Sequence, residues 1–318
     1  MVSKINPIKG KDVDSLYAGI EFNAVKYKYE DSKPSWLLLG PSGGGKEGRG
    51  KYLLELFPIH EKLSSGDIFR NKILAGLSER DMNKLKEEGK KLGNKLKEIS
   101  RNFDKVKKIF EKNKIKYKNQ DQALAAFQTL NGLFVDDSIL IDYASEQLKE
   151  FREKGVVLDG HIRTKDQVEH VVNAAKEHKM SIGAVLLVHT PLSVLEKRTV
   201  GRLKCPEPGC KRDYNTTNIK DPDNYPHEYF EDKEGLGWGK CHDHGHALRR
   251  RTDDYPDKVQ NRLGQYEEHI NEVLKELVVL GIPIYIVSGN LEIYSKDIMK
   301  LSVREALDCN NSEVMKRF

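Results

Sequence analysis

The chain lacks several features of membrane, secreted and nucleic-acid-binding proteins. Its 318 residues contain no run of eighteen apolar residues, and the first residues, Met1–Lys4, lack the apolar core of a secretory signal. Positive and negative charges are also nearly balanced, with 54 Lys and Arg against 49 Asp and Glu. This excess of five suits small polyanions, or simply a lysine-rich surface, and is too small for a nucleic-acid footprint. We expect a cytoplasmic monomer with no membrane and no nucleic-acid partner.

Aliphatic residues are scarce between Cys205 and Arg251, where Pro, Gly, Asp, Asn, Tyr and His dominate. Such a segment cannot bury enough apolar area to fold by itself. It holds Cys205, Cys210 and Cys241, with His244 three residues further on. Three thiolates and an imidazole suit tetrahedral Zn²⁺, and four protein ligands leave no open position, which predicts a structural metal site.

Two alternatives to this ligand set remain open at the level of sequence. Cys205 and Cys210 could form a disulfide, which a cytosolic setting disfavours. His242 or Asp243 could replace His244 as the fourth ligand. Cys309 lies apart from the cluster and is interpreted as an ordinary thiol.

Apolar runs alternate with amphipathic helical sequence over much of the chain, which is typical of an α/β fold with a parallel sheet and helices on both faces. In such sheets ligands bind at the carboxyl ends of the strands. The predicted core strands are Trp36–Leu39, Val156–Asp159, Ala184–His189 and Pro283–Val287.

The first of these strands runs into a glycine-rich loop, Gly40-x4-Gly45-Lys46. Backbone N–H groups at such a turn, a helix N-terminus and a lysine together form a phosphate cradle, although a flexible glycine turn is the alternative. The Ser or Thr that should follow the lysine is missing, because Glu47 and Gly48 stand there. A carboxylate near phosphates costs about 1 kcal/mol or more, so we expect weak binding of a phosphate-bearing ligand unless Glu47 points to solvent or Arg49 compensates.

A lysine-rich, glycine-poor block lies between Arg70 and Gly132. Leu92, Leu96 and Phe103 are among its apolar residues at helical spacing, which predicts helices that could form a hairpin. The block is interpreted as a solvated surface appendage, with a partner-docking arm as the alternative. Residues 1–34 form an extension without a strong period.

Several segments, in order along the chain, resemble motifs of the adenylate kinases. Arginine groups on either side of the cysteine-rich segment match the ends of that family's zinc-bearing lid, and His161-Ile162 departs from the family's Phe-Pro. The matching segments are the Gly40–Lys46 loop, Leu63-Ser-Ser-Gly-Asp67-Ile-Phe-Arg70, Gly132-Leu-Phe-Val-Asp-Asp137, Val157-Leu-Asp159-Gly-His-Ile-Arg163-Thr with Gln167, Arg198–Arg202, Arg251–Asp254 and Arg262-Leu263.

The resemblance implies a P-loop three-layer α/β/α fold and the reaction ATP + AMP to 2 ADP. The implied organisation has an extension at 1–34, a P-loop core at 35–64, 138–197 and 252–318, an AMP-binding domain with a helical insertion at 65–137, and a zinc-binding lid at 198–251. The implied substrates are ATP, bound together with Mg²⁺, and AMP. A catalytically weakened relative that binds nucleotides or a partner is the alternative, and a zinc-ribbon nucleic-acid binder is disfavoured by the small basic excess.

The resemblance also assigns roles to individual residues. Phosphoryl transfer needs positive charge around the migrating group and exclusion of water, which explains the many arginines. The implied catalytic residues are Lys46, Arg163, Arg202, Arg251 and Arg262. The implied ATP contacts are Gly43, Gly44, Gly45, Lys46, Glu47, Gly48, Arg198, Arg202 and Leu291. The implied AMP contacts are Ser65, Arg70, Leu133, Phe134, Val135, Gly160, Arg163, Gln167, Arg251 and Arg262, and Asp159 and Asp67 would organise Mg²⁺ through water.

Overall fold

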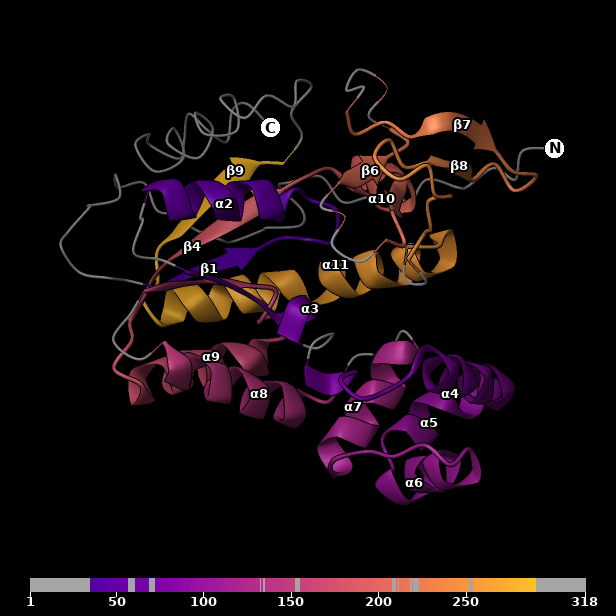
Figure 1. Ribbon diagram of the computed structural model, residues 1–318. Coiled ribbons are helices and arrows are strands. Elements are labelled where there is room, and N and C mark those ends of the chain that lie inside the picture. The colour runs from indigo at the N-terminus through magenta and orange to yellow at the C-terminus, as the bar shows by residue number, and fades with distance from the viewer. Residues whose placement is uncertain are drawn as a thin grey trace.

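The computed structural model describes residues 35–56, 61–68, 72–131, 133, 135–151, 155–207, 210, 212–217, 219, 223–251 and 254–289. Its centre is a parallel sheet with helices on both faces (Figure 1). The strand order within these residues is β2-β3-β1-β4-β9. The strands are β1 (Ser35–Leu39), β2 (Glu61–Ser64), β3 (Val156–Asp159), β4 (Ile182–His189) and β9 (Ile284–Ser288). The predicted α/β fold is thus confirmed.

Alternate residues of each central strand face opposite layers of the protein. Leu37 and Leu39 of β1 pack with helices α8 (Asp137–Glu150), α9 (Lys165–Glu177) and α11 (Pro256–Val279) on one face. Trp36 and Leu38 pack with α2 (Lys46–Leu56) on the other. Both faces are covered, which explains why the strands read as continuous apolar runs. Figure 1 shows α2 on one side of the sheet and α9 and α11 on the other.

The four predicted strands occur within two residues of their expected bounds, but β2 was missed. Its sequence, Glu61-Lys-Leu-Ser64, is short, polar and partly exposed, so it carries no apolar run. Its place at the sheet edge beside β3 sets Ser64 opposite Asp159. The next residues form a short helix, α3 (Ser65–Ile68), at the carboxyl edge of the sheet.

The lysine-rich block folds as several helices around an apolar core of its own. Side-chain caps begin three of them: Ser78 forms a capping box with Asp81, Asn102 accepts from the backbone N–H of Lys105, and Asn119 accepts from that of Gln122. Buried members of the core include Leu85 and Phe110. The helices are α4 (Glu79–Leu92), η2 (Gly93–Lys95), α5 (Leu96–Ser100), α6 (Phe103–Lys112) and α7 (Gln120–Leu130).

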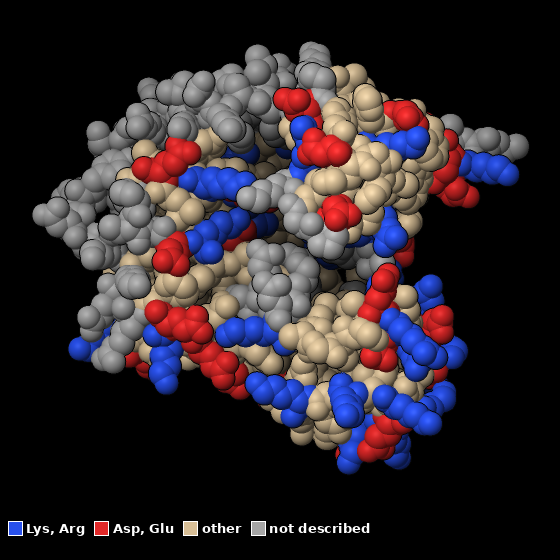
Figure 2. Space-filling model, viewed as in Figure 1, with Lys and Arg blue, Asp and Glu red and all other residues tan. Residues whose placement is uncertain are grey.

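On the surface of this bundle, basic and acidic side chains are interspersed rather than segregated (Figure 2). Ion pairs of the bundle include Lys105 with Glu98 and Lys112 with the largely buried Glu88. This agrees with the solvated interpretation of its outer face. The core shows, in addition, that the block is a folded unit and not merely a surface appendage.

The cysteine-rich segment forms small antiparallel hairpins after helix α10 (Leu192–Val200). Its apolar core is small, with Leu203, Tyr214 and Leu248 buried beside Cys241. No helix among the described residues is long and apolar enough to cross a membrane. The hairpin strands are β5 (Arg202–Lys204), β6 (Asp213–Asn215), β7 (His227–Glu231) and β8 (Gly237–Lys240).

Candidate functional site

The glycine-rich loop connects β1 to α2 as predicted, and Lys46 is the first residue of that helix. Gly43 and Gly45 have positive φ angles of 80° and 81°, which L side chains rarely adopt. A Cβ on Gly43 would also collide with the Thr199 hydroxyl. Both positions therefore require glycine for backbone shape as well as for close approach.

The ammonium of Lys46 folds back onto its own loop. It donates to the carbonyl oxygens of Gly40 and Pro41 at 2.7 and 2.8 Å. Burial is the main reason that the pKa of Lys46 is lowered to about 8; Asp159 opposes the shift, whereas Arg163 and Arg202 add to it. A bound polyanion would offer this buried cation a better partner than two neutral carbonyls.

The residue after the lysine does not place its charge deep in the loop. Glu47 has a side chain 60% exposed and pairs with Lys51 one helical turn away, at 3.3 Å. Arg49 is fully buried and donates to the carbonyls of Gly45 and Ser288, so it ties the loop to the end of β9. The expected repulsion between Glu47 and a bound phosphate is thus reduced by solvent exposure and by Lys51. Arg49 instead holds the loop in place.

One cavity of about 1120 Å³ opens at the carboxyl ends of the strands and extends to the helical bundle and the hairpin segment. It brings together most of the residues that the sequence singled out. Those lining it are Gly43, Gly44, Gly45, Lys46, Glu47, Ser65, Leu133, Val135, Asp159, Gly160, Arg163, Gln167, Arg198, Arg202, Arg251 and Arg262.

A few predicted positions do not join this set. Gly48 is not among the lining residues. Arg70, Phe134 and Leu291, and the side chain of Asp67, lie outside the described part of the chain, as do the extension 1–34 and Cys309.

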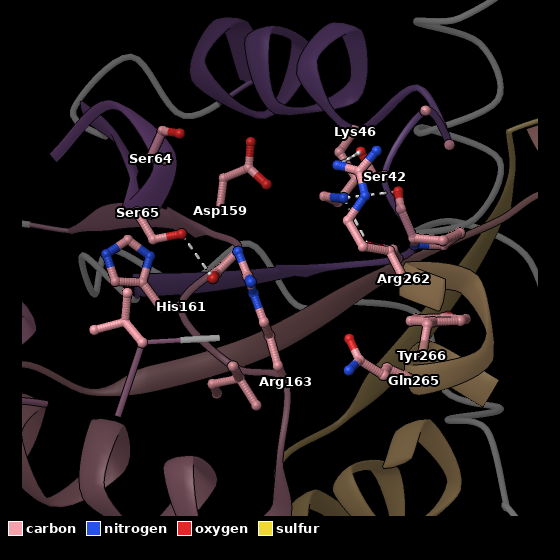
Figure 3. Close-up of a pocket in the computed structure, with 18 of the residues that line it drawn as sticks. Ser42, Lys46, Ser64, Ser65, Asp159, His161, Arg163, Arg262, Gln265 and Tyr266 are labelled. Atoms are coloured by element: carbon pink, nitrogen blue, oxygen red, sulfur yellow. Dashed lines mark hydrogen bonds between the residues drawn. The ribbon is translucent and has the colours of Figure 1, made fainter. Parts of the chain in front are cut away.

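Figure 3 shows how the labelled side chains divide the cavity. Ser64, Ser65 and His161 lie on one side, Ser42, Lys46 and Arg262 on the other, and Asp159 and Arg163 between them. The two sides come from different strand ends, β2 and β3 against β1, together with helix α11. A ligand with two anionic or polar ends could therefore span the cavity.

A fully buried carboxylate organises two of the arginines. Asp254 accepts two hydrogen bonds from Arg202, at 2.9 and 2.7 Å, and one from Arg262 at 3.1 Å. Arg198 donates to the carbonyl of Gly289 at 2.8 Å. These guanidinium groups are held in place at the cavity wall, which lowers the entropy cost of gripping a phosphate.

The opposite end of the cavity is less charged. The Ser65 hydroxyl donates to the carbonyl of Gly160 at 2.7 Å, and the Gln167 side-chain oxygen accepts from the backbone N–H of Arg163 at 2.7 Å. Leu133 and Val135 add apolar surface. Gln167 is 2% exposed and therefore belongs to the framework of this end, not to the protein surface.

Sequence reasoning missed several side chains at the cavity. Lys62, one residue before the Leu63 motif, forms an ion pair with Asp159 at 3.1 Å, and both side chains are largely buried. His161 is 9% exposed, and burial is the main reason that its pKa is lowered to about 4. Lys204 and Lys258 also line the cavity. His161 lies inside a recognised motif, where the sequence showed it only as a departure from the family pattern. Lys62 directly precedes another motif and Lys204 directly precedes Cys205, so these positions carried a local signal.

The predicted metal ligands converge in the hairpin segment. The ligand atoms of Cys205, Cys210, Cys241 and His244 all lie within 4.8 Å of one another. Individual separations are 3.7 Å from Cys205 Sγ to His244 Nδ1, 3.4 Å from Cys241 Sγ to the same nitrogen and 3.9 Å from Cys210 Sγ to Cys241 Sγ. A tetrahedral zinc site spaces such atoms about 3.5–3.8 Å apart, so these donors fit one ion.

The same geometry decides between the alternatives left open by the sequence. Cys205, Cys210 and Cys241 are free thiols in this structure, where no Cys205–Cys210 disulfide is formed. The His242 ring instead contacts the Tyr225 carbonyl at 2.8 Å, and Asp243 pairs with Arg212 at 2.7 Å. The Tyr214 hydroxyl donates to Cys241 Sγ at 3.3 Å and supports the cluster from outside.

No protein-family model matches the chain. Curated relatives do: an adenylate kinase of Kosmotoga olearia is 28% identical over 81% of this chain and 92% of its own length. An adenylate kinase of Methanothrix thermoacetophila is 28% identical over 77% of this chain and 87% of its own. An adenylate kinase of Acholeplasma laidlawii is 25% identical over 85% of this chain and 98% of its own length. The resemblance first seen in the motifs is thereby confirmed: the chain is similar to curated adenylate kinases over about four fifths of its length.

Proposed function

We propose that this protein is a nucleoside monophosphate kinase that catalyses reversible phosphoryl transfer, ATP + AMP to 2 ADP. One observation carries the proposal: the phosphate loop with Lys46 and the polar residues at the end of β3 line a single cavity. Direct transfer between two nucleotides requires donor and acceptor to meet in line, shielded from water.

On the donor side, the backbone of Gly43–Gly45 and the Lys46 ammonium hold the β- and γ-phosphates of ATP. Arg198 and Arg202 cover them from the base of the hairpin segment. Lys46 leaves the carbonyls of Gly40 and Pro41 to contact the phosphates, where its charge is needed as negative charge develops.

On the acceptor side, Arg163, Arg251 and Arg262 grip the AMP phosphate and the group in transit. Ser65, Leu133, Val135, Gly160 and Gln167 shape the site of the AMP nucleoside. Arg70 and Phe134 for AMP, and Leu291 for ATP, complete the assignment from outside the described residues.

Mg²⁺ accompanies ATP in this proposal and supplies charge neutralisation at its phosphates. Asp159 is the described carboxylate that would hold the water around it, with Asp67 as the second. Lys62 already pairs with Asp159, and Gly48 offers no hydroxyl where the family's motif has one.

Cys205, Cys210, Cys241 and His244 would hold a structural Zn²⁺ that stabilises the hairpin segment. We accordingly propose residues 198–251 as a lid, 65–137 as the AMP-binding domain, and 35–64, 138–197 and 252–318 as the core. The lid excludes water and brings Arg202 and Arg251 to the phosphates. A cytoplasmic monomer is part of the same proposal.

A coupled assay of ADP formation tests the activity directly. Lys46→Ala should lower kcat by at least a hundredfold with the fold intact, whereas Lys176→Ala, at an exposed position of α9 away from the cavity, should leave it within twofold. If the parent protein binds ATP and AMP but shows no turnover, the alternative of a catalytically weakened nucleotide-binding protein is favoured. The missing hydroxyl at Gly48 is the observation behind that alternative. Parent-like turnover by Lys46→Ala would contradict the assignment of the loop.

A further inference from the structure

His161 follows the turn that ends β3 and faces the cavity. Gly160, with φ of 75°, turns the chain immediately before it. The imidazole is 9% exposed and lies on the same side of the cavity as Ser65 (Figure 3). In the resembling motif a phenylalanine stands here, so the imidazole is a departure that belongs to this chain.

Both ring nitrogens of His161 lack a hydrogen bond of acceptable geometry to any described residue. The Asp159 charge and a weak interaction with the Asp159 backbone both favour the protonated ring, but neither gives a ring nitrogen a hydrogen bond of acceptable geometry. A neutral imidazole offers one N–H donor and one acceptor. Leaving them unpaired in a buried place opposes folding, which a phenylalanine of similar shape would not do.

The surroundings identify what could pair with this ring. A phosphate would be gripped by cations, and the arginines of the cavity provide those. Ser65 lies on the same side of the cavity as the ring, and Gln167 and Val135 line the same cavity. The charges of Asp159 and Arg163 act on the ring in opposite directions, so the polar and apolar groups there suit an uncharged, polar-edged ligand. A nucleoside has such edges on its base and on its ribose.

We propose that His161 hydrogen-bonds to the nucleoside part of the acceptor nucleotide and thereby determines which acceptor the enzyme selects. The inference rests on the proposed function. A site whose buried polar group is paired only by the correct ligand discriminates against ligands that lack the matching group. His161 is thus a specificity-determining residue whose hydrogen bonds are completed only by the substrate.

Two measurements on His161→Phe test this. Titration calorimetry with AMP should show about 3- to 10-fold weaker binding, with ATP binding unchanged. Thermal unfolding of the nucleotide-free protein should show an equal or higher Tm, because the unpaired imidazole is gone. His170→Phe, the same change at an exposed position of α9, should alter neither. A purely structural role would instead lower Tm and weaken both nucleotides.

Acceptor analogues distinguish the two sources of the hydrogen bond. If His161 bonds to the ribose, 2′-deoxy-AMP should bind the parent protein and His161→Phe with equal affinity. If His161 bonds to the base, inosine monophosphate should bind the two proteins with equal affinity. A loss that persists with both analogues, or unchanged AMP affinity in His161→Phe, overturns the inference. Failure of the parent protein to bind AMP would instead refute the proposed function itself.

Discussion

Replacing Asp254 by Asn should destabilise the protein far more than its conservative chemistry suggests. The carboxylate is completely buried and accepts three hydrogen bonds from two arginines, at 2.7, 2.9 and 3.1 Å. Asparagine keeps one acceptor oxygen, but it removes the charge and presents an NH₂ group to guanidinium donors. Removal of one partner from a buried ion pair costs about 3–5 kcal/mol.

The solvent exposure of Arg202 and Arg262 indicates where in this range the loss of unfolding free energy should lie. Their side chains are 24% and 25% exposed, so water can partly hydrate them once the carboxylate is gone. We therefore expect the free energy of unfolding to fall by about 3 kcal/mol. Because Arg202 and Arg262 also lose their common anchor at the cavity wall, kcat should fall about tenfold.

Urea unfolding of the nucleotide-free protein, followed by fluorescence and circular dichroism, measures this change. Asp257→Asn is the matched control, since that carboxylate is 71% exposed and its contact with Lys258 is 3.6 Å long. The control should change the free energy of unfolding by less than about 0.5 kcal/mol. If Asp254→Asn costs less than about 1 kcal/mol, or no more than the control, Asp254 is not the anchor that the geometry indicates.

Other consequences concern the phosphate loop and the metal cluster. Because the pKa of Lys46 is lowered to about 8, its charge is lost as pH rises through that value, and kcat/KM for ATP should fall above pH 8; a flat profile to pH 9.5 would contradict this. The unfolded chain holds that proton up to its ordinary pKa of 10.5, so Lys46 makes the free energy of unfolding rise with pH between about 8 and 10.5, measurable by urea unfolding at several pH values. Gly48→Thr should raise kcat relative to Gly48→Ala, which gains helix propensity without a hydroxyl, and equal rates in steady-state assays would show that the hydroxyl is not needed. With Glu47 also changed to Gly, the gain should be only slightly larger, because Lys51 already compensates its charge. Purified protein should carry about one zinc per chain by elemental analysis. Cys241→Ser should lower that content and loosen residues 205–250 in hydrogen exchange while the sheet stays protected; full zinc in the variant would refute the ligand set.

The amino-acid sequence by itself determined the elements whose signals are local. Central strands buried on both faces must be continuously apolar, so Trp36–Leu39 and Val156–Asp159 were predicted with nearly correct bounds. The glycine loop was recognisable because positive φ angles at Gly43 and Gly45 require glycine. Scarcity of aliphatic residues around the cysteines pointed to a metal for the same local reason.

Only the tertiary structure decided how side chains from distant segments meet. β2 is an edge strand without an apolar run, and its pairing with β3 brings Lys62 to Asp159, a contact that no local pattern announces. Asp254 pairs with Arg202, 52 residues before it in the chain, and with Arg262 on helix α11. The exposure of Glu47 depends on which face of helix α2 carries it. The identity of His244 as the fourth candidate ligand likewise depends on partners that His242 and Asp243 find elsewhere. Burial, charge pairing and ligand geometry are properties of three-dimensional neighbours, and several of these neighbours are far apart in the sequence, as Arg202 and Asp254 are at 52 residues.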